Sequence, residues 1–574
     1  MFIEQDRIVA DLVLHNGNVI TLDPASRVAE AVAVVDGTIV AVGSDERVKR
    51  LAGGSTRVID LLGSSVIPGL VDNHTHQLMA GLDTAAAGVK VNISLCRSIE
   101  EVKAEIAAAA HRARPGEWIT TSCLYRGGIV EGRFPTRHDL DAVAPDNPVY
   151  IADGGRNIIV NTLALELAGI TPDTPDPGAG DPDISEGHIV RDKHGVPTGH
   201  LIVGAGDLAR RKWWQRLGQP VKMWDLLSFD LETNIRALRA QMALFNAAGI
   251  TGTRDMGVAP NEIDAYAELS RRGEATVRTD LVLGLPVQHL TTQEISAALR
   301  LYFGPKQGLG DDWLRVGGLK IVAQNYGYWS MQPEKLRRLI TEGNQMGWRF
   351  AIHGTPGDLR DDIEVILDAM EEAHAQAPLD GRRWSYEHAF GLINPEHHRR
   401  LRRLGVIIAA NPLLSYFAAG RSLEMHEMLE AVRLAEAPDG LAPRDRTVRE
   451  WAQPIRTWMN AGLVVTGGTD CPAVVYDGDC PLLGLWASFS QDTLAGTLMP
   501  EETISRELAL RMWTTNNAYA TFEDHRKGSI EKGKLADLVV LSGDPLTVPD
   551  GEFLDLKVLE TVVGGRTVHE YVRT

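Results

Sequence analysis

Short apolar runs alternate with amphipathic stretches through the middle of this 574-residue chain. The runs have the length of buried strands, and they lie at residues 66–71, 249–254, 278–283, 314–322, 349–352, 383–387, 405–409 and 462–466. Helical patterns lie between most of them, at residues 261–272, 293–302, 333–346, 359–375, 395–404 and 448–461. Strands and helices that alternate in this way predict an α/β fold built on a (β/α)8 TIM barrel.

Both ends of the chain are rich in strand-forming residues and tight turns. Strand patterns lie at residues 11–15, 19–22, 31–35, 38–42, 535–541 and 559–563. The dipeptides Asn16-Gly17 and Asp36-Gly37 favour hairpins, and Gly564-Gly565 favours a turn near the other end. We therefore predict that the two ends pair in one small β domain.

The segment between the first two predicted barrel strands is too long for a single crossover connection. Residues 85–235 must therefore contain an inserted α+β subdomain. An alanine-rich helix is predicted at residues 100–113, and a loop rich in proline, aspartate and glycine at residues 171–183.

Composition narrows the class of protein. The chain is 44% hydrophobic and 23% charged, which is ordinary for a soluble globular protein. Its formal net charge of −18 argues against a nucleic acid or an anionic membrane as its partner. No signal-peptide core and no run of roughly 20 apolar residues is recognised. The 4 cysteines are irregularly placed, so we expect a cytoplasmic protein without a disulfide framework. The partner is predicted to be a small-molecule substrate, and a homodimer remains open.

Candidate metal ligands follow the apolar strands. The run VIPGLVDNHTH at residues 66–76 ends with His74 and His76, whose i, i+2 spacing on a strand directs both imidazoles to one face. The ends of later strands supply Lys320, His353, His388 and Asp470. Because barrel enzymes carry their sites at the C-terminal ends of the strands, we expect these groups to meet. Such ligands suit zinc, and also manganese, iron or cobalt.

Each of these residues alone has an ordinary structural interpretation. A histidine at a strand end is often a satisfied core residue, Lys320 can be a surface lysine, and Asp470 can cap a helix. Their coincidence at the strand ends of one barrel favours the metal site. Lys320 is the unusual member, because an ammonium group repels a cation. It is either carbamylated, so that it bridges two metals, or unmodified, so that it orients the substrate or nearby hydrogen bonds.

Specific motifs cover essentially the whole chain: VIPGLVDNHTH, PTRHDLDAVAPDNPVYI (135–151), VNTLALELAGI (160–170), HIVRDKHGVPTGHL (188–201), AIHG, YEHAF, GGTDCP and KGSIEKGKLADLVVLSGDPL (527–546). Together they resemble the amidohydrolase superfamily, specifically its YtcJ-like branch (amidohydrolase family 3). The resemblance implies a composite β-sandwich of residues 1–65 and 528–574 beside a barrel of residues 66–527. It also implies that the metal is bound or lined by His74, His76, His353, His388 and Asp470, and that Lys320 matches the family lysine.

The chain departs from the family pattern at three places. IVAQNYGYW follows Lys320 where relatives usually have an Asp-Gly pair soon after, and Arg156 stands where many relatives have histidine. GTPGD follows His353 in place of the usual AIGD type of sequence. These departures bear on the number of metals, one or two, and on the substrate class.

The favoured function is a metal-dependent hydrolase that cleaves a carbon–nitrogen bond other than a peptide bond. A metal-bound water is the nucleophile, and Asp470 takes its proton and later gives it to the leaving nitrogen. His388 can stabilise the oxyanion in place of binding metal. A lyase, decarboxylase or isomerase reaction at the same site is the alternative. A non-catalytic scaffold is disfavoured, because the ligand set is complete.

Candidate substrate contacts come from the inserted region and from the loop after the fourth strand. Tyr326, Tyr328 and Trp329 can stack on an apolar or aromatic substrate, or they can pack against the subdomain. Arg156 can bind a substrate carboxylate or form a structural salt bridge. Cys471, next to Asp470, is interpreted as a small buried residue.

Overall fold

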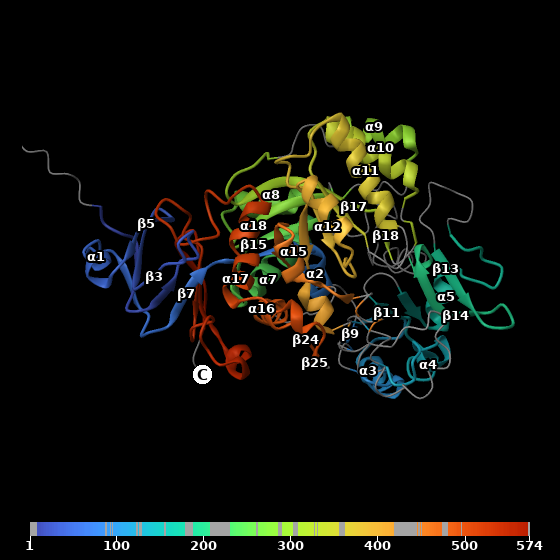
Figure 1. Ribbon diagram of the computed structural model, residues 1–574. Coiled ribbons are helices and arrows are strands. Elements are labelled where there is room, and N and C mark those ends of the chain that lie inside the picture. Colours follow the sequence, from blue (N-terminus) through green and yellow to red (C-terminus); the bar gives the residue numbers. More distant parts are fainter. Residues whose placement is uncertain are drawn as a thin grey trace, which may run out of the picture.

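A computed structural model describes most of the chain. It describes residues 8–571 apart from 86–88, 92, 94–95, 122–123, 125–128, 154–156, 178–186, 207–229, 260–261, 285–289, 302–307, 326–327, 330, 355–361, 418, 420–444, 446–447, 449–450, 473–479 and 495. Three groups of strands follow one another across the molecule in Figure 1: a β-rich lobe, a central barrel and a smaller sheet beyond it.

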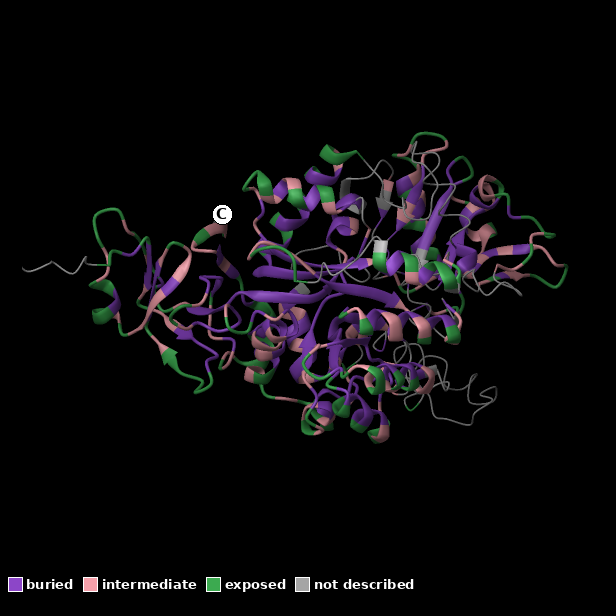
Figure 2. Cartoon of the chain, turned by 90° about the horizontal axis from the view of Figure 1, so that it is seen from above, coloured by how far each residue is buried: buried purple, intermediate pink, exposed green. Residues whose placement is uncertain are grey.

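The central sheet has eight parallel strands that pair in chain order, which confirms the predicted barrel. They are β8 (Leu70–Thr75), β15 (Ile250–Val258), β16 (Arg278–Gly284), β17 (Leu314–Val322), β20 (Phe350–His353), β21 (Ser385–His388), β22 (Ile407–Ala410) and β23 (Val465–Gly467). Figure 2 shows these strands as a buried layer within the molecule.

Helices lie between successive barrel strands and after the last one. They are α2 (Gln77–Ala85), α7 (Leu231–Ala247), α8 (Ile263–Arg271), α9 (Thr292–Leu301), α10 (Pro333–Gln345), α11 (Asp362–Gln376), α12 (Pro395–Arg403), α15 (Ile455–Asn460), α16 (Cys480–Ser490), α17 (Arg506–Met512) and α18 (Thr515–Ala520). Pro333 and Pro395 occupy the first turns of α10 and α12, as their fixed φ angle favours.

Side chains close the seam between the first and last barrel strands. The buried Asn517 amide donates to the carbonyl oxygen of Gly467 at 2.9 Å and to that of Val71. Asn73 Nδ2 donates to Thr466 Oγ1 at 2.8 Å. Because buried carbonyls need donors, Asn517 replaces part of the ladder that two adjacent strands would otherwise form.

Replacing Asn517 by alanine is expected to lower the free energy of unfolding by about 1–3 kcal/mol, because two buried carbonyl groups lose a donor. The measurement is the thermal midpoint at a fixed scan rate, with Asn460→Ala as a control at an exposed position. Equal midpoints for the two variants would show that the seam does not depend on this amide.

The first barrel strand begins later than predicted. The apolar run of residues 66–71 is divided between β7 (Ser65–Pro68), which pairs antiparallel with β26 (Leu538–Leu541), and β8 in the barrel. Gly69 joins the two strands, and a Cβ atom there would lie 2.2 Å from Thr251 Oγ1. One continuous apolar run therefore serves two sheets, a division that hydrophobicity alone does not mark.

Two sheets form the β-rich lobe. One contains strands from both ends of the chain, in the order β28 (Arg566–Glu570), β27 (Val558–Val563), β26, β7, β2 (Asn18–Ile20) and β3 (Val28–Ala29). The other is β5 (Thr38–Gly43), β4 (Ala31–Val35), β1 (Leu12–His15) and β6 (Arg57–Asp60). Leu14, Val34 and Leu538 share one hydrophobic cluster between them. We propose that residues 1–65 and 528–574 form one domain, to which β7 also contributes.

A third sheet lies between α2 and α7 in sequence. Its order is β13 (Gly187–Arg191), β14 (Pro197–Val203), β12 (Asn157–Val160), β11 (Val149–Asp153), β10 (Ile119–Thr121) and β9 (Val89–Val91). Its helices are α3 (Ile99–Ala110), α4 (Arg137–Asp141) and α5 (Thr162–Ala168). We propose that it is the inserted subdomain expected at residues 85–235.

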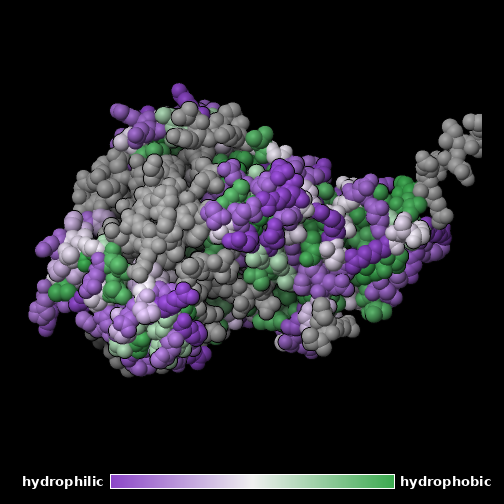
Figure 3. All heavy atoms as spheres, turned by 180° about the vertical axis from the view of Figure 1, so that it is seen from behind, coloured by the Kyte–Doolittle hydropathy of each residue, from purple (hydrophilic) through white to green (hydrophobic). Residues whose placement is uncertain are grey.

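The remaining elements are short. They are α1 (Asp45–Lys49), β18 (Gln324–Asn325), β19 (Tyr328–Trp329), β24 (Asp492–Thr493), β25 (Gly496–Thr497), η3 (Pro500–Glu502) and η4 (Asp550–Asp555). Within the described part of the chain, every helix is too short or too polar to cross a membrane. Figure 3 shows hydrophilic and hydrophobic side chains interspersed over the β-rich lobe.

Candidate active site

His74 and His76 lie at the C-terminal end of β8, at the mouth of the barrel. The Nδ1 atom of His74 lies 2.5 Å from Oε2 of Glu387, and Nδ1 of His76 donates to the Met256 carbonyl oxygen at 2.8 Å. Both Nδ1 atoms face acceptors, so each imidazole turns its Nε2 toward the centre of the site.

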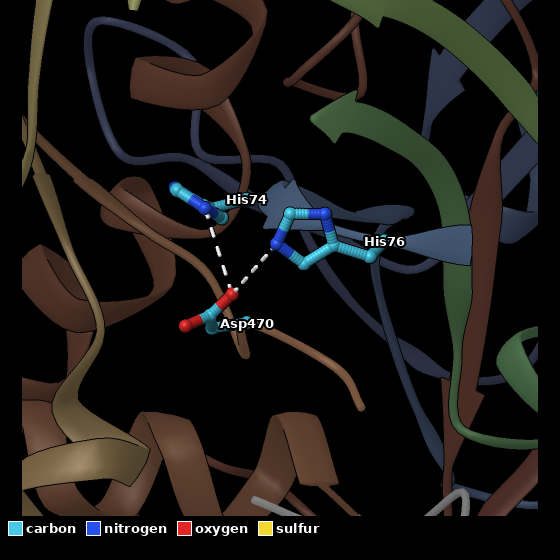
Figure 4. Close-up of side chains that lie close together, drawn as sticks. All are labelled: His74, His76 and Asp470. Carbon is cyan, nitrogen blue, oxygen red and sulfur yellow. Dashed lines mark ion pairs between the residues drawn. The ribbon is translucent and has the colours of Figure 1, made fainter. Parts of the chain in front are cut away.

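Asp470 follows β23 and brings its carboxylate between the two imidazoles. Its Oδ1 lies 3.5 Å from Nε2 of His74 and 3.3 Å from Nε2 of His76 (Figure 4). The residue has a φ of 57°, a left-handed conformation that aspartate tolerates better than most residues. Its backbone N–H donates to the His74 carbonyl oxygen at 2.7 Å, so the two chain segments are joined directly.

A second buried carboxylate supports this junction. Asp72 Oδ1 accepts from the backbone N–H groups of His74 at 3.1 Å and Thr469 at 3.0 Å. Asp72 Oδ2 accepts from Thr469 Oγ1 at 2.5 Å. Burial raises the pKa of Asp72 to about 7, against these hydrogen bonds. Asp72 thereby ties the end of the first barrel strand to the segment that carries Asp470.

The donor set of this triad fits a divalent metal. One ligand atom from each of His74, His76 and Asp470 lies within 4.8 Å of the other two, and each atom can offer a lone pair to a cation. Acceptors that face one another repel unless a cation or a proton lies between them. Two imidazole nitrogens and a carboxylate oxygen are ligands that zinc and related metals prefer.

Electrostatics keep the Asp470 carboxylate ionised. Burial opposes its ionisation, but the neighbouring His74 ring and the hydrogen bond with His76 hold the pKa of Asp470 well below its ordinary value. Its side chain is therefore a carboxylate at neutral pH, as both a metal ligand and a general base require.

Lys320 lies at the same centre. It is on β17, is buried, and its Nζ lies 3.4 Å from Nε2 of His74. Burial lowers the pKa of Lys320 to about 8, although the charges of Glu387 and Asp470 raise it. A larger fraction of the amine is therefore neutral near pH 7 than for an exposed lysine.

His353 and His388 form a pair beside the triad. His388 Nδ1 donates to Asn411 Oδ1 at 2.9 Å, so its Nε2 accepts from His353 Nδ1 at 2.8 Å. The ring centroids of His388 and His74 are 4.5 Å apart, and His388 Nδ1 lies 3.9 Å from Asp470 Oδ2. Burial lowers the pKa of both imidazoles of the pair well below the ordinary value, so both are neutral.

The structure thus brings the predicted ligand residues to one end of the barrel, but it arranges them in two groups. His74, His76 and Asp470 converge with Lys320 beside them, whereas His353 and His388 hydrogen-bond to each other. The assignment of metal and catalytic roles to all six stays a prediction.

The predicted substrate contacts fall mostly outside the described part of the chain. Arg156 and Tyr326 lie outside the described residues. Tyr328 and Trp329 form strand β19, which pairs antiparallel with β18, but their side chains are outside the described part as well. Cys471 is buried, and its backbone carbonyl accepts from the His76 backbone N–H at 2.7 Å.

Sequence reasoning missed the polar residues beneath the site. All of them are buried. Glu387 contacts His74, Arg254 contacts Glu387, and Asn411 contacts His388. Strand alternation was the available signal, because Ser385 and Glu387 are i and i+2 on a strand and share one face. A charged side chain on a buried face of a barrel strand needs hydrogen-bond partners, so this pattern indicates a polar cluster inside the barrel.

Comparisons with known proteins identify the family of this chain. A model described as "Amidohydrolase family" matches residues 57–569. The N-substituted formamide deformylase of Arthrobacter pascens is 29% identical over 98% of this chain and 99% of its own. The putative amidohydrolase YtcJ of Bacillus subtilis strain 168 is 28% identical over 97% of this chain and 99% of its own.

Among solved structures, an uncharacterized metal-dependent hydrolase from Pyrococcus horikoshii OT3 has the same fold. It gives a TM-score of 0.64 at 19% identity and covers 94% of this chain and 99% of its own. The family model spans most of the sequence and YtcJ matches nearly all of it. The chain therefore belongs to the amidohydrolase family, in its YtcJ-like branch.

Proposed function

We propose that this amidohydrolase hydrolyses the carbon–nitrogen bond of an N-substituted formamide or a closely related amide, with zinc as its metal. The observation that carries the proposal is the convergence of His74, His76 and Asp470, whose ligand atoms lie within 4.8 Å of one another at the barrel mouth. The formamide class is supported by the Arthrobacter pascens deformylase, which is 29% identical over 98% of this chain.

In the proposed mechanism the triad would hold the metal. When bound, a divalent metal supplies a water molecule of lowered pKa and polarises the substrate carbonyl. Asp470 accepts a proton from the attacking water at one carboxylate oxygen and gives it to the leaving nitrogen. The carboxylate suits both steps because neighbouring groups keep it ionised and it lies between the two imidazoles that would hold the metal.

The other predicted residues act on the substrate side of the centre. We assign the unmodified Lys320 amine to orient the substrate carbonyl, since its Nζ lies 3.4 Å from Nε2 of His74. His388 donates through Nδ1 to Asn411 and accepts through Nε2 from His353. In this arrangement the His388 ring has no N–H left to donate to an oxyanion. We therefore propose that His353 and His388 line the site and shape it.

Product analysis tests the proposed reaction. We expect zinc-loaded protein to convert N-alkyl and N-aryl formamides into equimolar formate and amine, quantified separately by enzymatic formate oxidation and by amine derivatisation. The His74→Ala, His76→Ala double variant, prepared in the same way, is the matched control. Carbon dioxide or an isomer formed without amine would support a lyase or isomerase instead. Turnover of acetamides but not formamides would retain the hydrolase and overturn the formamide assignment.

A further inference from the structure

Glu387 is a buried carboxylate that contacts a proposed metal ligand from below. It lies on β21, is 0% exposed, and its Oε2 is 2.5 Å from His74 Nδ1. The next residue, His388, has a φ of 68° and turns the chain at the strand end. Two consecutive residues of one strand therefore make different contacts: Glu387 contacts His74 from below, and His388 contacts His353 beside the triad.

Donors on the far side hold the Glu387 carboxylate in place. Oε1 accepts from Ser385 Oγ and lies 3.5 Å from Arg254 Nη1, which itself donates to Ser385 Oγ at 2.9 Å. The buried Arg254 guanidinium balances the charge of Glu387. This leaves Oε2 directed at His74.

The charges continue down the barrel interior. Arg254 Nε lies 3.8 Å from Asp280 Oδ2, and Arg349 Nη2 donates to the same oxygen at 2.8 Å. Two arginines and two carboxylates thus alternate from the base of the barrel to His74. Since side chains packed this tightly have few alternative positions, the series restrains the orientation of Glu387.

We infer that Glu387, held by Arg254 and Ser385, is a positioning residue that selects the metal-binding tautomer of His74. A carboxylate only accepts hydrogen bonds, so the proton of the neutral His74 ring must lie on Nδ1. Nε2 then keeps its lone pair for a metal. The inference rests on the proposed metal site and concerns how tightly that site binds zinc, not which substrate it cleaves.

Glu387→Gln gives the sharpest test, because Arg254 can only donate. The glutamine carbonyl must then face Arg254, which leaves the NH₂ group directed at His74 Nδ1. His74 Nδ1 becomes an acceptor, and its proton moves to Nε2, where it blocks the metal. We expect the dissociation constant for zinc to rise 10–100-fold, the range found when partners of ligating histidines are removed.

The experiment measures zinc affinity directly, by competition with a colorimetric zinc chelator on metal-free full-length protein. The absorption spectrum of bound cobalt(II) reports independently on the ligand set. Glu105→Gln is the matched control, because it makes the same substitution at an exposed position on α3, away from the barrel. It should bind zinc like the wild type. Circular dichroism and the melting temperature of each metal-free protein report on folding.

The outcomes separate the inference from the proposed function. Weaker zinc binding and an altered cobalt spectrum in a folded Glu387→Gln protein support the inference. Unchanged zinc affinity, even with a lowered melting temperature, overturns it and makes Glu387 a structural residue only. If Glu387→Gln does not fold, nitrogen-15 NMR of the His74 ring in the metal-free wild-type protein replaces it, and a neutral ring with its proton on Nε2 overturns the inference as well. A wild-type protein that binds no zinc overturns the proposed metal site itself.

Discussion

Replacing Asp470 by asparagine is expected to lower kcat roughly 10²–10⁴-fold without disturbing the fold. The amide has nearly the same shape as the carboxylate, so the backbone hydrogen bond from Asp470 to His74 survives. An amide oxygen cannot accept a proton near neutral pH, however. The proton of the attacking water then has no acceptor at the position that Asp470 occupies between His74 and His76.

The measurement is kcat on the best formamide substrate, with zinc determined in the same sample. Asp264→Asn, an exposed position on α8, is the matched control and should retain the wild-type rate. A zinc-loaded Asp470→Asn protein that turns over at the wild-type rate would contradict the role of Asp470 as general base. Loss of zinc together with activity would assign Asp470 to metal binding first.

Removing the metal is expected to abolish turnover reversibly. Without the metal, the triad can hold a water but supplies no divalent cation to lower the pKa of that water. Dialysis against a chelator should therefore eliminate formate release, and added zinc should restore it. Because a metal that binds only the folded protein stabilises it, the melting temperature should rise with zinc concentration.

Counting the metal decides the state of Lys320. We expect about one zinc per chain, because His353 and His388 hydrogen-bond to each other and are not part of the group whose ligand atoms all lie within 4.8 Å of one another. Two equivalents, with activity that depends on bicarbonate, would contradict this expectation and support a carbamylated Lys320 between two metals. The His74→Ala, His76→Ala variant is the control and should take up no zinc.

These tests also separate the competing functions. A scaffold would bind neither zinc nor substrate, and zinc-free protein that gains no activity from zinc, manganese, iron or cobalt would favour it. A lyase would retain the metal dependence but release no amine. Hydrolysis alone predicts equimolar amine and acid together with loss of both in the Asp470→Asn protein.

The barrel and its strand ends were predictable because their signals are local. Apolar runs of strand length that alternate with amphipathic helices define a (β/α)8 order, and residues 278–283 and 314–322 coincide with β16 and β17 to within one residue. Parallel strands in one barrel end at the same face, so polar residues after each strand were expected to meet there. The i, i+2 spacing of His74 and His76 is likewise a local property of a strand.

Boundaries that depend on a second segment were not predictable in this way. The run at residues 66–71 is uniformly apolar, yet Gly69 separates a strand of the β-rich lobe from a strand of the barrel. Only the approach of Thr251 and the pairing with β26 identify the division.

By itself, the sequence determined the barrel order, the family and the residue types that reach the barrel mouth, because periodicity and short motifs depend on neighbours in the chain. Only the tertiary structure decided which of those residues converge. Glu387 lies 313 positions from His74, and Asn411 lies 23 from His388, so their hydrogen bonds depend on packing. Those bonds determine which ring nitrogen carries the proton, and therefore which groups can bind a metal and which only support it.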